Sequence, residues 1–145
     1  MKSTAVIISA HGKFSEGILS TVKMIAGEFP NVKYINFLDG DTFETIDKQL
    51  KEAFDSFNGE YDNIIFMTDL MGGTPFNRSV MNFGEHENVR ILSGLNFASL
   101  FTAITSENDD IDVLADEIMN AGKDSITKYE LVRNDENLDD FEDGI

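Results

Sequence analysis

The chain has 145 residues, of which 41% are hydrophobic, and this favours one domain with a single substantial core. Its formal net charge of -16 argues against a nucleic-acid or anionic-membrane partner, because either would require a basic surface. The absence of cysteine excludes disulfides, thiolate metal sites and thiol catalysis. We expect a cytoplasmic protein, since no apolar run is longer than a strand and no signal-peptide pattern precedes the first run.

The first apolar run covers residues 4–10 and is continuous, which is typical of a strand buried on both faces. It ends at His11, and Gly12 then opens a turn. A histidine in this place lies at the carboxyl edge of a sheet, where α/β proteins hold ligands and catalytic groups.

The next elements are a helix, a strand and a second helix. Residues 32–37 alternate apolar and polar side chains, which predicts a strand near an edge of the sheet. The second helix begins with Thr42 or Asp41 as its N-cap. In order, these elements are a helix over 13–27, a strand over 32–37 and a helix over 42–57.

A second continuous apolar run, residues 63–68, predicts another buried strand, and this run ends at Asp69. A glycine-rich turn follows, and then a helix. We expect Thr74 to be the N-cap of this helix and Pro75 to occupy its first position, where the missing N–H costs nothing.

The remainder predicts a short strand, two helices and a last β-rich segment. Gly122 is expected to end the second of these helices. The tail, 134–145, holds six acidic and no basic residues, and we expect it to be solvated and mobile. In order, these elements are a strand over 89–92, helices over 97–104 and 111–118, and a β-rich segment over 126–132.

Four strands, each followed by a helix, predict an α/β three-layer sandwich with a mainly parallel sheet and right-handed crossovers. The two continuously apolar strands belong in the middle, which gives the strand order 2-1-3-4. In that order the chain leaves the two central strands toward opposite faces, and a crevice opens at their carboxyl ends. His11 and Asp69 would meet at this crevice.

An imidazole can attack a phosphoryl group if one ring nitrogen keeps its lone pair and the other carries the proton. Asp69 is placed to accept that N–H from His11 and to stabilise the cation that forms. The amides of Gly72, Gly73 and Thr74, with the Thr74 hydroxyl, could bind the phosphoryl oxygens at a helix N-terminus.

Other interpretations compete with this one. His11 could be a hydrogen-bonded turn residue, and the Gly-Gly-Thr-Pro run a simple turn and cap. In a receiver-like regulatory module Asp69 would accept the phosphate, but such modules need acidic residues after the first strand to hold Mg²⁺, and Ser9-Ala10-His11-Gly12 has none. A non-catalytic scaffold would leave the convergence of His11 and Asp69 unexplained. We interpret His86 as a surface residue and expect no metal and no cofactor.

Three motifs resemble the mannose-type enzyme IIA of the bacterial sugar phosphotransferase system. They are Val6-Ile7-Ile8-Ser9-Ala10-His11-Gly12, Phe66-Met67-Thr68-Asp69-Leu70-Met71-Gly72-Gly73-Thr74-Pro75-Phe76-Asn77 and Ile91-Leu92-Ser93-Gly94-Leu95-Asn96. The resemblance covers about the first 130 residues. It implies a mannose-type IIA domain over 1–133, followed by the acidic tail 134–145, and we expect a free-standing IIA protein.

The resemblance also implies a function. His11 would accept a phosphoryl group from the phosphocarrier protein HPr and pass it to a histidine of enzyme IIB, which phosphorylates the incoming sugar. The membrane components IIC and IID would be indirect partners. Members of the family are homodimers in which the last strand crosses to the partner's sheet, and segment 126–132 fits that description.

Overall fold

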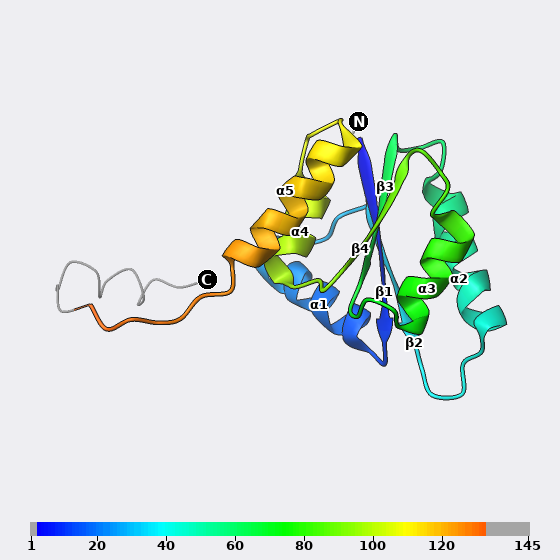
Figure 1. Ribbon diagram of the computed structural model, residues 1–145, viewed down its shortest axis with the longest axis horizontal. Coiled ribbons are helices and arrows are strands. Elements are labelled where there is room, and N and C mark those ends of the chain that lie inside the picture. The colour runs from blue at the N-terminus through cyan, green and yellow to red at the C-terminus, as the bar shows by residue number, and fades with distance from the viewer. Residues whose placement is uncertain (1–2, 133–145) are drawn as a thin grey trace.

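The computed structural model describes residues 3–132, which form three layers with a parallel sheet in the middle (Figure 1). The predicted acidic tail, 134–145, lies outside the described residues. The strands are β1 (Thr4–His11), β2 (Val32–Phe37), β3 (Asn63–Thr68) and β4 (Val89–Ser93). The helices are α1 (Phe14–Ala26), α2 (Phe43–Phe57), α3 (Thr74–Phe83), α4 (Phe97–Thr105) and α5 (Ile111–Asp124).

The strands pair in parallel in the order β2-β1-β3-β4, which confirms the predicted α/β class and strand order. All six residues of β3 are buried, as are all residues of β1 before His11. By contrast, the consecutive residues Lys33 and Tyr34 of β2 are exposed, in agreement with the predicted position of this strand at an edge of the sheet. Because buried apolar strands need neighbours on both sides, this burial pattern explains the order.

Helices cover both faces of the sheet. Helices α2 and α3 cover the face that carries Ile7 and Phe66, and α1, α4 and α5 cover the face that carries Ile8 and Met67 (Figure 1). These four side chains are at most 1% exposed. The sheet is therefore held between two apolar layers, and its carboxyl edge is a rigid support for the loops that follow the strands.

The start of α3 differs from the prediction by one residue. Gly73, and not Thr74, is the N-cap, with φ -73° and ψ 166°. The Gly73 carbonyl accepts the first helical hydrogen bond from the amide of Asn77 at 2.8 Å. Thr74 is thus the first residue of the helix, Pro75 the second, and no side chain caps this helix end.

Gly122 does not end α5, which continues to Asp124. The prediction was wrong because this glycine serves the packing of α5 against α4 and does not end the helix. A Cβ on Gly122 would lie 3.1 Å from the Cβ of Ser99, and the Gly122 carbonyl accepts a hydrogen bond from Asn96 Nδ2 at 3.0 Å. The missing side chain lets α5 approach the N-terminus of α4 closely.

Segment 126–132 forms no strand within the single chain, although its sequence is rich in β-formers. It leaves the end of α5 and runs away from the sheet (Figure 1). Ile126 is 80% and Leu131 68% exposed. A strand is stable only with a neighbour to pair with, and this segment pairs with neither free edge, β2 or β4, of its own sheet.

A charged contact joins α2 to α3 below the carboxyl edge. Asp47 accepts hydrogen bonds from Arg78 Nε at 2.9 Å and Nη2 at 2.6 Å, and a third from Asn82 Nδ2 at 2.9 Å. The hydrogen bonds from Arg78 hold the pKa of Asp47 below its ordinary value of 3.8. A carboxyl whose pKa is lowered by folding stabilises the protein above that ordinary value and loses this contribution as the pH falls through the lowered one.

We therefore expect Asp47→Asn to lower the thermal unfolding midpoint by a few degrees at pH 7, and the difference from the wild type to shrink below about pH 4. Thermal melts between pH 2 and 7 measure both effects. Asp55→Asn is the control, because Asp55 is 57% exposed and, among the described residues, pairs only with Lys51 of the same helix, a contact of small energy. A constant difference across the pH range would contradict the prediction.

Candidate functional site

His11 is the last residue of β1 and the first exposed residue of that strand. Gly12 follows it with φ +59°, a conformation that favours glycine. The Gly12 amide donates a hydrogen bond to the Phe37 carbonyl at 2.8 Å, which anchors the turn to the end of β2. The backbone thus turns away directly after His11 and leaves its imidazole, 44% exposed, at the carboxyl edge of the sheet.

Asp69 directly follows β3, the neighbour of β1, and contacts His11 through one oxygen. Its Oδ2 lies 2.9 Å from His11 Nδ1 and also accepts the backbone amide of His11 at 3.2 Å. An ionised carboxylate has no proton to donate, so Nδ1 carries the hydrogen of this contact and Nε2 keeps its lone pair. The two residues that the sequence placed at one crevice are therefore in direct contact.

Two further observations describe the surroundings of the pair. Asp69 Oδ1 is buried and accepts no hydrogen bond from the residues that the structure describes. A buried oxygen without a donor costs free energy. The Phe37 ring meets the imidazole edge to face, with the ring centres 5.9 Å apart.

The glycine-rich turn lies between Asp69 and α3. Gly72 has φ +83°, and its carbonyl accepts a hydrogen bond from Asn77 Nδ2 at 2.9 Å. The Gly73 amide donates to the Leu70 carbonyl at 3.1 Å, so this one of the predicted phosphate donors is already engaged in the turn. The amides of Gly72 and Thr74 and the Thr74 hydroxyl have no hydrogen-bond partner among the described residues.

Two residues near the site received no role from the sequence. Asn77 ties the glycine turn to the first turn of α3, and the only signal for it was an asparagine four residues after Gly73. Phe37 contacts the imidazole, which follows from its place at the end of the neighbouring strand. Sequence alone could not distinguish such a contact from core packing.

The third motif after β4 has a structural role. The Leu95 amide donates to the Thr68 carbonyl at 3.2 Å, which continues the contact between β3 and β4 beyond the strands. Asn96 caps α4: its side chain accepts the Ser99 amide at 3.0 Å. This loop therefore supports the end of β3, from which Asp69 extends.

His86 lies in the loop before β4, at the amino edge of the sheet and thus opposite His11. It is exposed, and its ring packs on Phe54 at 5.0 Å between centres. Within residues 3–132 no three His, Cys, Asp or Glu side chains are grouped to hold a metal ion. Over the same range no helix has the length and apolar character needed to cross a bilayer.

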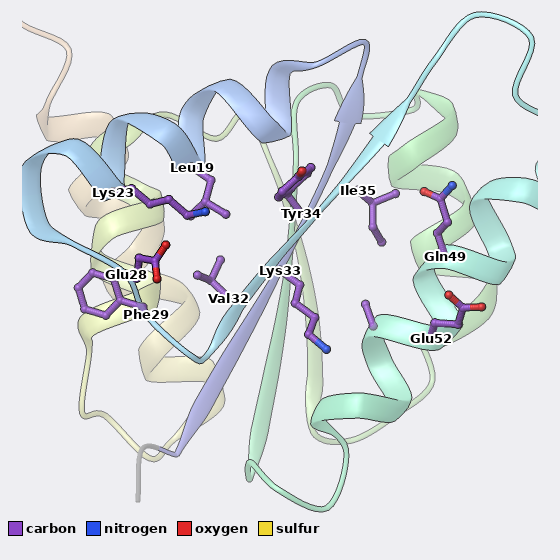
Figure 2. A pocket seen from close by; sticks show the side chains of 11 residues that line it. Leu19, Lys23, Glu28, Phe29, Val32, Lys33, Tyr34, Ile35, Gln49 and Glu52 are labelled. Atoms are coloured by element: carbon purple, nitrogen blue, oxygen red, sulfur yellow. The ribbon is translucent and has the colours of Figure 1, made fainter.

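A groove of about 540 Å³ follows the free edge of β2, between α1 and α2. Figure 2 shows Lys33 and Tyr34 projecting from the strand, with Lys23 on one side and Glu52 on the other. Its charges are of both signs, and none of the predicted site residues lines it. The chemistry-bearing groups are thus gathered at the carboxyl edge of the sheet and not in this groove.

The doubly wound α/β fold carries a carboxylate-supported imidazole at its crevice, and the acidic residues that a receiver-like module needs after its first strand are absent from Ser9-Ala10-His11-Gly12. The sequence model of the family described as "PTS system fructose IIA component" matches residues 5–119, where PTS stands for phosphotransferase system. The chain therefore belongs to this family of phosphotransferase-system IIA components.

Individual relatives agree with this assignment. The chain is 30% identical over 109 residues to the mannose-specific EIIAB component of Escherichia coli, a match over 73% of this chain and 32% of that protein. It thus spans about one third of that relative. The structure of the EIIA component from Streptococcus agalactiae is similar with a TM-score of 0.78 and 34% identity, covering 86% of this chain and 96% of that one. The mannose/sorbose IIA subunit from Enterococcus faecalis has a TM-score of 0.81 and 27% identity, covering 92% and 99%.

Proposed function

We propose that the protein is a phosphoryl carrier in which His11 accepts phosphate from phospho-HPr and passes it to a histidine of enzyme IIB during sugar uptake. The observation that carries this proposal is the 2.9 Å contact between His11 Nδ1 and Asp69 Oδ2. It fixes the tautomer in which Nε2 is the nucleophile. The protein acts as a phosphotransferase in the cytoplasm and requires no cofactor for this reaction.

The transfer exchanges one N–P bond for another. The Nε2 lone pair of His11 attacks phosphorus while the bond to the donor's histidine breaks and its electron pair returns to that ring. The donor's imidazole, protonated on its other nitrogen, leaves neutral. His11 becomes a phosphorylated imidazolium whose Nδ1–H stays bonded to Asp69, and the carboxylate stabilises the new positive charge. The reverse sequence of bond changes delivers the phosphoryl group to enzyme IIB.

The phosphoryl oxygens require donors, and the turn at the start of α3 is suited to supply them. The amides of Gly72 and Thr74 and the Thr74 hydroxyl are unengaged by the described residues, at the positive end of the α3 dipole. Gly73 completes this turn. Hydrogen bonds from these donors would stabilise the anionic phosphoryl group, which the acidic protein would otherwise repel.

Docking of the protein partners fits the surface around His11. Phe14, Leu70 and Met71 belong to the loops and helix start at the carboxyl edge and are 47%, 58% and 76% exposed. Exposed apolar side chains of this size suit a transient protein interface. The membrane components IIC and IID act only indirectly, since a carrier that contacts phosphohistidines does not touch the sugar.

The proposal is tested with purified HPr, enzyme I and phosphoenolpyruvate, followed by mass-spectrometric mapping of the phosphorylated residue. We expect one phosphate on His11, with a linkage that is labile in acid and stable in base, as for a phosphoramidate. A base-labile acyl phosphate on Asp69 would overturn the proposal in favour of a receiver-like module.

We also propose a homodimer in which segment 126–132 adds a strand to the partner's sheet. Strand β4 is an edge of the sheet, and an unpaired edge is normally covered. Segment 126–132 is exposed, has β-forming residues and forms no strand in its own chain. Exchange of such a segment between copies is a low-cost route to a dimer.

Truncation after Ser125, which keeps α5 intact, is therefore expected to convert the dimer into monomers or aggregates. Removal of 134–145 alone is the matched control and should leave the dimer unchanged. Light scattering at micromolar concentration distinguishes these states. A full-length protein that is already monomeric would exclude the exchanged strand.

A further inference from the structure

Gly73 lies so close to the imidazole that no side chain fits at its position. A Cβ built on Gly73 would be 2.8 Å from His11 Cε1 and 3.6 Å from His11 Nε2. The backbone at Gly73, with φ -73° and ψ 166°, is ordinary extended structure that any residue adopts. The absence of a side chain is therefore required by the space beside the ring and not by the backbone conformation.

The adjacent glycine has the opposite requirement. Gly72 has φ +83°, which a residue with a side chain adopts only with strain, yet a Cβ there would meet nothing within 4 Å. The two glycines thus do separate things: Gly72 makes the turn, and Gly73 accommodates the ring. This division is invisible in the sequence, where the two residues are identical.

Three groups together fix the imidazole of His11. Asp69 bonds Nδ1, the Phe37 ring meets the imidazole edge to face, and the side of the Gly73 α-carbon that would carry a side chain faces Cε1. The Gly73 amide is held by the Leu70 carbonyl at 3.1 Å, so the wall that it forms is part of the hydrogen-bonded turn. The nitrogen left open is Nε2.

We propose that Gly73 is a positioning residue for phosphoryl transfer: its α-carbon sets the tilt of the His11 ring so that Nε2 points at the incoming phosphorus. The inference rests on the proposed carrier function of His11. Its role differs from that of a phosphate donor, because the Gly73 amide is already engaged and the contact runs through carbon.

Gly73→Ala should displace the ring without unfolding the protein. The methyl group can be accommodated only if the imidazole rotates or moves away from Asp69, because the one near atom outside the imidazole is the Leu70 carbonyl oxygen at 3.3 Å, which belongs to the turn. Misplacement of a reacting group by about 1 Å can slow a reaction roughly 100-fold, and we expect a loss of that order.

Gly17→Ala is the matched control. Gly17 lies within α1, where the same added methyl meets nothing within 4 Å. Single-turnover transfer from phospho-HPr, measured over a range of donor concentrations, separates docking from chemistry. We expect Gly73→Ala to lower the maximal rate about 100-fold with little change in the half-saturating concentration, and Gly17→Ala to leave both unchanged. Phosphorylation by phosphoramidate, a small donor that needs no docking surface, should fall in parallel.

A direct measurement on the wild-type protein makes the test independent of how the variant folds. We expect a strong nuclear Overhauser effect between the Gly73 α-protons and His11 Hε1, and its absence would overturn the proposal. Transfer by a folded Gly73→Ala variant within about threefold of the wild type would overturn it as well. A wild-type protein that takes up no phosphate at His11 would instead refute the carrier function on which the inference rests.

Discussion

We expect the His11→Gln variant to take up no phosphate from phospho-HPr, whereas the His86→Gln variant is labelled at the wild-type rate. The chain has two histidines, so each variant leaves one imidazole in place. His11 contacts a carboxylate at the carboxyl edge of the sheet, while His86 packs on Phe54 at the opposite edge. Under the proposed function, His11 is therefore the imidazole whose charge, once it is phosphorylated, would be compensated by a carboxylate.

The measurement is the incorporation of phosphate from labelled phosphoenolpyruvate by each variant under identical amounts of enzyme I and HPr. Glutamine replaces the ring by an amide of similar polarity, and thermal melts should show that both variants stay folded, since both side chains are exposed. Residual labelling of His11→Gln at the wild-type rate would place the phosphate elsewhere. Loss of labelling in His86→Gln would show that the amino edge takes part in docking or transfer.

The strand order was predictable because strands that are buried on both faces consist almost entirely of apolar residues. Strands β1 and β3 lie between two apolar layers, and their continuous apolar runs reflect contacts on both faces. The edge strand β2 is less buried, with Lys33 and Tyr34 exposed, and its sequence lacks a continuous apolar run. The meeting of His11 with Asp69 followed from the same reasoning, because parallel neighbouring strands end at the same edge.

The features that sequence could not predict are set by contacts between distant parts of the chain. Gly122 resembles a helix stop, but α5 continues through it because Asn96 and Ser99 need its bare backbone. The β-forming residues of 126–132 cannot build a strand without a pairing edge, and they pair with neither of the free edges, β2 and β4, of their own sheet. Local propensity yields to tertiary context in both cases.

The glycine turn shows the same limit within the site itself. The sequence predicted three amide donors at Gly72, Gly73 and Thr74, yet the Gly73 amide is bonded to Leu70 and a side chain at this position would overlap the ring of His11. A Gly-Gly pair in a sequence does not indicate which glycine adopts the positive φ of the turn and which one leaves space for the imidazole of His11. That distinction depends on where the ring of His11 lies, and therefore on the pairing of β1 with β3.

The second large effect is expected for Asp69→Asn, which should slow phosphoryl transfer by on the order of 100-fold while the protein stays folded. The amide oxygen can still accept the His11 Nδ1–H and the His11 backbone amide, so the ring keeps its place. The amide does not carry the negative charge that, in the proposed mechanism, stabilises the imidazolium formed on transfer. The maximal rate should therefore fall with little change in the half-saturating HPr concentration.

We expect Asp69→Asn to change the stability of the folded protein little. Asp69 Oδ1 is buried without a hydrogen-bond partner among the described residues, and the substitution replaces a charged group there by a neutral one. Asp55→Asn is the control for the loss of one carboxylate from an acidic protein, since Asp55 is exposed and, among the described residues, pairs only with Lys51. Stopped-flow or quenched single-turnover transfer from phospho-HPr measures both variants. If Asp69→Asn transferred phosphate as fast as Asp55→Asn, the carboxylate would have no part in stabilising the charge, and the 2.9 Å contact would serve only to orient the ring.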